Sequence, residues 1–213
     1  MGSDPINWVR PHKLEGESMV IGLIGGVGAG KSSVLDVLTQ EYQFTACRTD
    51  DIAKSFYVHG HPVFEALKAL LGADIERADG SVDLPVFASR IYGVGKQKLR
   101  SQVDSIVHPA VWKYVDAQVR AARKSGAEIV VETALPIAHF VELCDEVWFV
   151  YTEEAVRIAR LMETRGYSEE KARAMIHAQI PDDEYAVMAD FVIDNSGSRE
   201  ETEKTIREHL HEG

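Results

Sequence analysis

The sequence has few of the features that mark membrane, metal-binding and nucleic-acid-binding proteins. No apolar run approaches the roughly 20 residues that a membrane-spanning helix requires, so we expect no membrane association. Basic residues number 23 against 34 acidic ones, and the net charge of −11 is opposite in sign to the surface of a general nucleic-acid binder. The eight histidines form no zinc pattern on a helix, and we expect no structural metal.

Cysteine is also scarce. Cys47 and Cys144 are the two present, far apart and outside any metal-ligand spacing. This favours two buried thiols in a reducing cytoplasm, and therefore a cytoplasmic protein. The other proportions, 45% hydrophobic and 27% charged residues in a chain of 213, are typical of a globular protein with one sizeable domain and insertions.

The first 18 residues do not look like part of the fold. Residues 1–18 mix proline, glycine and charges without periodicity, and they contain no apolar core of a secretory signal. Met19 directly precedes the first apolar segment. We interpret residues 1–18 as a leader introduced by cloning; a short natural extension is the alternative.

The most informative stretch is a glycine-rich loop that matches the pattern G-x-x-x-x-G-K-[ST] from Gly25 to Ser32. An apolar segment of strand length precedes it, and helical spacing follows it. Glycines let the backbone turn its N–H groups toward phosphate oxygens, and the next helix adds its positive end. We expect Lys31 to reach the β- and γ-phosphates of ATP and Ser32 to bind Mg²⁺. The predicted ATP-binding residues of the loop are Gly26, Val27, Gly28, Ala29, Gly30, Lys31, Ser32 and Ser33.

Five strand-like segments alternate with helical ones, which predicts an α/β fold with a doubly wound five-stranded parallel sheet of the P-loop kinase type. Glu132 ends the third segment, where an acid associated with Mg²⁺ lies in many phosphate-loop proteins. A solvated strand end is the equal alternative for Glu132. The segments are Val20–Ile24, Phe44–Cys47, Glu128–Glu132, Glu146–Tyr151 and Asp190–Asn195.

Two carboxylates follow the second segment, at the sheet edge where open α/β folds bind ligands. Asp50 is the better candidate for chemistry. Asp51 is either a second site residue or the N-cap of a helix that begins at residue 52.

Residues 52–125 are helical by pattern and too long for a simple crossover, so we expect a helical insertion that binds the acceptor. Within it, His108-Pro109 predicts a helix end, with Pro109 opening a new helix. Residues 153–182 carry several arginines and form either a solvated face or a mobile lid over a transferring phosphoryl group. Residues 19–51, 126–152 and 183–213 would make the nucleotide-binding core.

The chain is small and lacks an N-K-x-D-like guanine motif, so a small-molecule kinase fits better than a GTPase or a motor ATPase. From Met19 onward it resembles the dephospho-CoA kinase family. The stretches that carry the resemblance are Ile21–Ser32, Thr49–Lys54, Leu71–Ile75 with Asp79-Gly80, Val107–Pro109, Ala178-Gln179 and Ala189–Ser198.

The resemblance implies a transferase that uses ATP to phosphorylate the ribose 3′-hydroxyl of dephospho-CoA. The products are coenzyme A and ADP, in the last step of coenzyme A biosynthesis, with Mg²⁺ as cofactor. It implies that Asp50 is the general base and that Lys54 and His108 line the acceptor. The residues implied beside ATP are Arg160 and Arg165 at the transferring phosphoryl, and Asn195 and Ser198 at the adenine end.

The chain departs from the family pattern on the acceptor and lid sides. Arg48 stands where the family has aspartate, Lys54 where it has arginine, and Met175 where it has arginine. Ala134 and Ala138 mark a segment that lacks the family's proline position and its acid. Arg165 lies one position after the place where the family has its second arginine of this segment. Two alternatives therefore remain: a P-loop kinase for another nucleoside or nucleotide acceptor, and a nucleotide-binding regulatory protein with little turnover. In each case we expect a monomer or weak homo-oligomer.

Overall fold

The computed structural model describes residues 18–212, so the expected leader, apart from Ser18, lies outside the described residues. The described chain divides into two compact units. Unit 1 comprises residues 18–47 and 119–212, and unit 2 comprises residues 48–118. Residues 153–182 are part of unit 1, together with the sheet.

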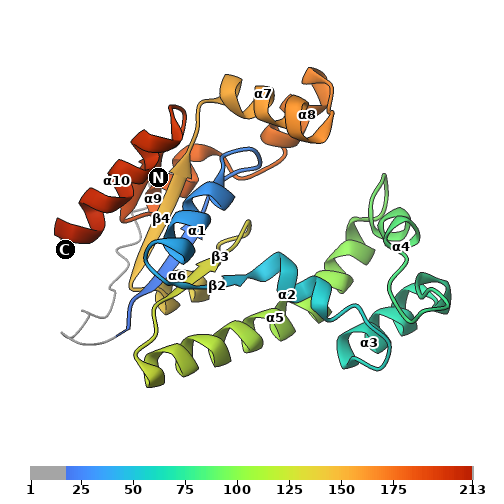
Figure 1. Ribbon diagram of the computed structural model, residues 1–213. Coiled ribbons are helices and arrows are strands. Elements are labelled where there is room, and N and C mark those ends of the chain that lie inside the picture. Colours follow the sequence, from blue (N-terminus) through green and yellow to red (C-terminus); the bar gives the residue numbers. More distant parts are fainter. Residues whose placement is uncertain (1–17, 213) are drawn as a thin grey trace, which may run out of the picture. The chain divides into compact units, whose positions relative to one another are not determined.

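Unit 1 is built on a five-stranded parallel sheet with the order β2-β3-β1-β4-β5 (Figure 1). Strand β1 lies in the middle of the sheet and pairs on both sides: Gly22 is opposite Val131 of β3 and Val147 of β4. Every residue of β1 is buried. This confirms the predicted fold class. The strands are β1 (Val20–Ile24), β2 (Thr45–Arg48), β3 (Ile129–Glu132), β4 (Glu146–Tyr151) and β5 (Phe191–Asp194).

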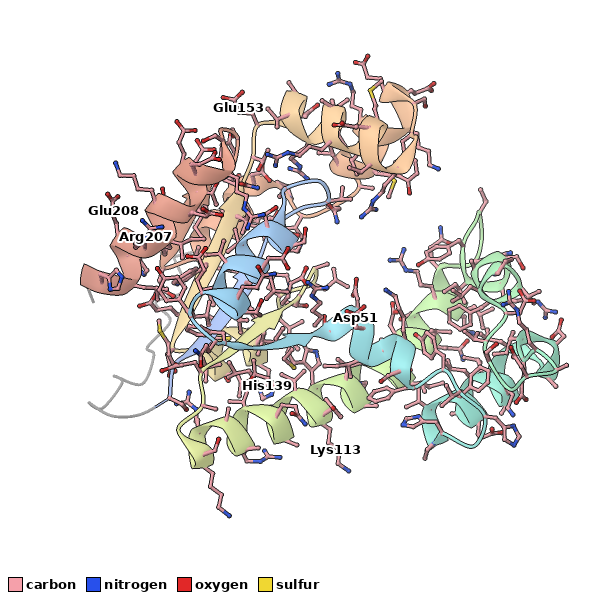
Figure 2. All side chains as sticks on the ribbon, in the orientation of Figure 1. Asp51, Lys113, His139, Glu153, Arg207 and Glu208 are labelled. Atoms are coloured by element: carbon pink, nitrogen blue, oxygen red, sulfur yellow. The ribbon has the colours of Figure 1, made fainter. Side chains whose placement is uncertain are left out.

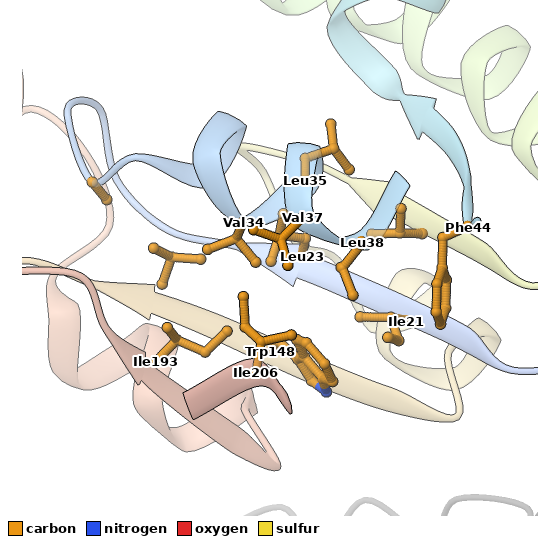
Figure 3. Close-up of a cluster of buried hydrophobic side chains, with 13 residues drawn as sticks. Ile21, Leu23, Val34, Leu35, Val37, Leu38, Phe44, Trp148, Ile193 and Ile206 are labelled. Atoms are coloured by element: carbon orange, nitrogen blue, oxygen red, sulfur yellow. The ribbon is translucent and has the colours of Figure 1, made fainter. Parts of the chain in front are cut away.

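Helices cover both faces of this sheet. Alternate strand residues such as Ile21 and Trp148 pack against one pair of helices, α1 and α10 (Figure 3). On the opposite face, a side chain at Gly22 would strike Phe140 of α6, and Phe149 stacks on Tyr185 of α9. The helices that lie within unit 1 are α1 (Lys31–Gln40), α6 (Ala138–Leu143), α7 (Glu154–Arg165), α8 (Glu169–His177), α9 (Asp182–Met188) and α10 (Arg199–Glu212).

The buried cluster between the sheet and α1 fixes the start of that helix. Val34, Leu35, Val37 and Leu38 are the buried residues of α1. Burial of each such side chain is worth about 1.5–3 kcal/mol. The loop that joins β1 to α1 is therefore anchored at both ends by well-packed elements.

Unit 2 is helical, as predicted for this part of the chain. Its helices begin with clear signals: His61 caps α3 ahead of Pro62, and Asp83 accepts a hydrogen bond from the Val86 N–H at the start of α4. The helices are α2 (Thr49–Ser55), α3 (Pro62–Leu71), the 3₁₀ turn η1 (Ala73–Ile75), α4 (Leu84–Ile91) and the first part of α5 (Gln97–Ser125).

The predicted helix break at His108-Pro109 is wrong, because α5 runs on through Pro109. Its buried face repeats every four residues on both sides of the proline, and that continuous apolar face outweighs the backbone bond that proline cannot make. The predicted end at Gly126 is confirmed by a left-handed φ of 74°. The buried face consists of Val103, Val107, Val111, Val115 and Val119.

The predicted start of the next helix at residue 52 is also wrong. Helix α2 begins at Thr49 with Arg48 as N-cap, so Asp51 lies inside the first turn and is not the cap. A carboxylate in the first turn is stabilised by the positive end of the helix.

Candidate functional site

The glycine-rich segment forms a loop between β1 and α1. Gly28 and Gly30 have φ angles of 77° and 86°, which side-chain-bearing residues rarely adopt, and Gly30 is the N-cap of α1. The first turn of α1 contains no acidic residue that would offset the positive end of the helix. Free N–H groups and a positive potential at one helix start are the requirements of a phosphate site.

Lys31 folds back across this loop. Its Nζ donates to the Gly25 carbonyl oxygen at 2.8 Å and lies 3.8 Å from Oε1 of Glu132. The structure therefore brings Glu132, at the carboxyl end of β3, to the lysine of the loop. Ser32 is exposed in the first turn of α1, and Ser33 donates its N–H to the Gly30 carbonyl at 2.9 Å.

The Mg²⁺ expected with ATP needs few protein ligands, because this ion keeps waters and binds through substrate phosphates. Among residues 18–212, no three His, Cys, Asp or Glu side chains form a cation site of their own. The exposed hydroxyl of Ser32 at the start of α1 fits a single protein ligand beside nucleotide phosphates.

The underside of the loop is held by the ends of β4 and β5. The Ala29 carbonyl accepts two hydrogen bonds of 2.8 Å, from Nδ2 of Asn195 and Oγ1 of Thr152. Asn195 is only 4% exposed, and its Oδ1 accepts from Thr202 of α10. Both polar ends of the Asn195 side chain are therefore used within the protein, so the structure makes this residue a support of the loop. Its expected contact with ATP stays a prediction.

Of the two arginines predicted at the site, Arg160 is adjacent to the loop. Its Nη2 donates to the Asn195 carbonyl at 2.8 Å, and its Nη1 would lie 3.2 Å from a Cβ at Gly30. Arg165 is the exposed last residue of α7, and the described part of the chain shows no hydrogen bond or ion pair from it. Arg173 forms surface ion pairs with Glu154 and Glu169. The arginine segment is thus partly a solvated face and partly a support of the loop.

Two further residues of the segment 153–182 were missing from the predicted site. Arg157 of α7 donates from Nε to the Val27 carbonyl at 2.9 Å, and Gln179 accepts from the Val27 N–H at 2.6 Å. Arg157 lies three positions before Arg160, which places both on one side of α7. That spacing is the sequence signal that points to Arg157.

Ser198 belongs to the start of α10. Its N–H donates to Oε2 of Glu201 at 2.8 Å, and its hydroxyl accepts from the Glu201 N–H at 3.2 Å. This is the capping box that the sequence predicts. The role of Ser198 at the adenine end of ATP stays a prediction.

In unit 2, Asp50 is exposed in the first turn of α2. The neighbouring Asp51 also lies on α2 (Figure 2). It pairs with both cations around it: its carboxylate oxygens lie 3.4 Å from Nζ of Lys54 and 3.9 Å from Nη1 of Arg48. Arg48 and Lys54, two of the departures from the family pattern, therefore meet at one carboxylate.

Two more polar groups of unit 2 bear on the expected acceptor side. His108 is exposed on α5, with Nε2 3.8 Å from Oδ1 of Asp104. Burial raises the pKa of Tyr57 to about 12, and the negative groups Asp104 and Asp50 add to the effect, together with Tyr92. Tyr57 is therefore a neutral hydrogen-bonding phenol at physiological pH.

The remaining departures lie in unit 1. The Ala134 carbonyl accepts from the Tyr185 hydroxyl at 3.2 Å, Ala138 is the first residue of α6, and Met175 is half-buried on α8.

The part of the chain that the structure describes contains no helix long and apolar enough to cross a membrane.

Comparison with known proteins assigns the family. The dephospho-CoA kinase family model matches residues 19–201. A dephospho-CoA kinase of Carboxydothermus hydrogenoformans is 37% identical over 189 residues, which cover 88% of this chain and 90% of the relative.

Solved structures agree at the level of the fold. A Thermus thermophilus protein, TT1252, superposes with a TM-score of 0.73 at 24% identity, covering 92% of this chain and 98% of that one. A dephospho-CoA kinase from Campylobacter jejuni gives a TM-score of 0.66 at 20% identity, with coverages of 91% and 98%. The family match, the curated relative and the phosphate loop lead to one conclusion: this chain belongs to the dephospho-CoA kinase family.

Proposed function

We propose that this protein transfers the γ-phosphoryl group of ATP to the ribose 3′-hydroxyl of dephospho-CoA, giving coenzyme A and ADP as the last step of coenzyme A biosynthesis. The observation that carries the proposal is the glycine loop at the acid-free start of α1, with Lys31 folded over it, in a chain of this family. Such a loop binds nucleotide phosphates through backbone N–H groups.

The loop residues Gly26 to Ser33 would hold the ATP phosphates, and Lys31 would exchange its bond to the Gly25 carbonyl for one to a phosphate oxygen. Ser32 would bind Mg²⁺, which neutralises charge on the β- and γ-phosphates when it is present. Glu132, 3.8 Å from Lys31, would hold a water of that ion or orient the lysine.

Transfer needs positive charge over the moving phosphoryl group and a partner for the acceptor hydroxyl. Arg160, supported at the Asn195 carbonyl, would supply the charge, and Arg165 would join it if the lid moves. Asp50 would accept the proton of the 3′-hydroxyl or orient that hydroxyl, because a loose transition state requires little proton abstraction. Lys54 and His108 would contact the acceptor, and Asn195 and Ser198 would lie toward the adenine.

The chain would work in the cytoplasm as a monomer or weak homo-oligomer, with ATP and dephospho-CoA as its partners and without nucleic acid or a membrane.

One observation favours a second candidate, a kinase of the same fold with another nucleoside or nucleotide acceptor. Arg48 stands where the family has aspartate, and it pairs with Asp51 beside the proposed base. A cation at this position changes the charge that an acceptor would meet.

The test is the consumption of Mg·ATP by the purified protein with dephospho-CoA, and separately with adenosine, AMP and shikimate. Lys31→Ala serves as the blank. ADP release that depends on dephospho-CoA and is absent from the blank is the expected result. ATP binding without turnover on dephospho-CoA would overturn the proposal, and turnover on another acceptor would favour the second candidate.

A further inference from the structure

Two side chains of the segment 153–182 form hydrogen bonds with the backbone of Val27. Its carbonyl accepts from Nε of Arg157 at 2.9 Å, and its N–H donates to Oε1 of Gln179 at 2.6 Å. The two contacts reach across 130 and 152 positions of sequence. A loop that must present several N–H groups in one direction is thus fixed at its third residue by two side chains from outside the loop.

The Arg157 side chain is buried and held in position by further contacts. It is 3% exposed, and its Nη1 donates to Asp182, the first residue of α9, at 3.1 Å. Its guanidinium occupies the space beside Gly26, because a Cβ there would lie 2.1 Å from Nη2. A buried guanidinium is costly unless it is paired and fully hydrogen-bonded, and here Asp182 and the Val27 carbonyl provide the partners.

We propose that Arg157 is a positioning residue for nucleotide binding, which fixes the phosphate loop through the Val27 carbonyl and is itself oriented by Asp182. We refer to Arg157, Asp182 and Gln179 around Val27 as the Val27 clamp. This inference rests on the proposed function only in that the loop binds ATP phosphates, and it does not depend on the acceptor.

The clamp preorganises the loop for nucleotide binding. Without the clamp, the loop would sample other conformations, and ATP would have to restore the binding one at the expense of affinity. A hydrogen bond from a charged donor is a strong one, so its loss should weaken ATP binding by about ten- to a hundredfold. Acceptor binding should be unaffected, because among residues 18–212 the side-chain hydrogen bonds of the clamp reach only Val27 and one another.

The test uses the full chain and two readouts. Calorimetric titration with Mg·ATP in the absence of acceptor measures affinity, and hydrogen exchange of the nucleotide-free protein measures protection of the Val27 amide. The variants are Arg157→Met, Arg157→Lys, Asp182→Asn and Gln179→Ala. Arg173→Met is the matched control, because Arg173 is a lid arginine whose ion pairs with Glu154 and Glu169 lie on the surface.

We expect Arg157→Met to weaken ATP binding and to speed exchange at residues 25–31, with Arg157→Lys recovering part of the affinity. Asp182→Asn should show a smaller change in the same direction, which keeps the test informative if Arg157→Met folds poorly. Arg173→Met should match the wild type.

Unchanged ATP affinity and unchanged exchange in folded Arg157→Met would overturn the clamp. Faster exchange throughout the chain in both Arg157→Met and Asp182→Asn would also overturn it, since Arg157 would then be a general stabiliser. Failure of the wild type to turn over dephospho-CoA would count against the proposed function alone. The exchange measurement needs no ligand and still decides whether Arg157 fixes the loop.

Discussion

Asn195 and Ala29 lie 166 positions apart in sequence, yet Nδ2 of Asn195 donates to the Ala29 carbonyl at 2.8 Å beneath the phosphate loop. Thr202 of α10 donates to the other end of the same amide at 2.9 Å. The last strand and last helix therefore help to set the shape of the first loop. A substitution at Asn195 or Thr202 should therefore change the affinity for ATP.

Asn195→Ala should lower both stability and ATP affinity. The substitution leaves the Ala29 carbonyl with one partner fewer and the buried Thr202 hydroxyl without its Asn195 acceptor, which should cost about 1–3 kcal/mol in the free energy of unfolding. Urea unfolding and ATP titration measure the two effects. Thr205→Ala is the control. Within residues 18–212, the Thr205 hydroxyl bonds only the Glu201 carbonyl on the exposed side of α10, so the substitution should change stability by less than about 0.5 kcal/mol. Equal effects of the two variants would contradict the support role.

Gly30→Ala should abolish ATP binding. Gly30 has a φ of 86°, and a Cβ there would lie 2.1 Å from Nδ2 of Asn195. The Asn195 amide cannot move away without breaking its hydrogen bond to the Ala29 carbonyl. Gly126→Ala is the matched control, because Gly126 has a φ of 74° and, apart from its chain neighbours, no described residue comes within 4 Å of its Cβ position. The control should lose about 1–2 kcal/mol of stability from backbone strain alone and keep ATP binding. Similar ATP affinities in both variants would show that the close contact at Gly30 is not needed.

Asp50→Asn should spare ATP binding and reduce kcat for dephospho-CoA by at least about tenfold, because an amide cannot accept the hydroxyl proton. Steady-state kinetics with both substrates separate kcat from the KM for ATP. Asp51→Asn is the neighbouring control: Asp51 is exposed and is paired with Arg48 and Lys54, so its loss should change kcat little. If Asp50→Asn keeps full kcat, Asp50 is not the general base.

The sequence predicted what local patterns specify. The apolar segments around Gly22 and Val147 become neighbouring strands, and the glycine pattern becomes a loop with left-handed backbone at Gly28 and Gly30. These features depend on residues close together in the chain, where side-chain periodicity and glycine freedom act directly.

The Val27 clamp and the contacts of Asn195 beneath the loop could not be predicted from such local patterns. Arg157 contacts Val27 across 130 positions, and its spacing to Arg160 places both on one side of α7 without showing that this side meets the loop. Only the packing of α7 against the loop decides which arginine is buried. The same holds for Asn195, whose amide is used by Ala29 and Thr202 once β5 is in place.

Pro109→Ala should stabilise the protein. Pro109 is exposed within α5 and cannot donate a backbone hydrogen bond, so alanine restores a donor and improves helix propensity without removing buried surface. We expect the free energy of urea unfolding to rise by about 1–3 kcal/mol. Lys113→Ala, an exposed substitution one turn further along α5, should change it by less than about 0.5 kcal/mol (Figure 2). A decrease in stability with Pro109→Ala would mean that the proline shapes a bend on which packing depends.

Cys47 should resist alkylation in the native protein. Burial raises the pKa of its thiol from 9.0 to about 11, so the reactive thiolate at pH 8 is about a hundredfold scarcer than in the unfolded chain. Because the folded-state pKa lies above the unfolded value, this burial contributes stability below pH 9 that is lost as the pH rises toward 11. The measurement is the rate of iodoacetamide labelling of Cys144→Ala between pH 7 and 10, with the same variant in urea as the unfolded reference. Native labelling at pH 8 that is as fast as labelling in urea would show that Cys47 is accessible and that its thiol ionises normally.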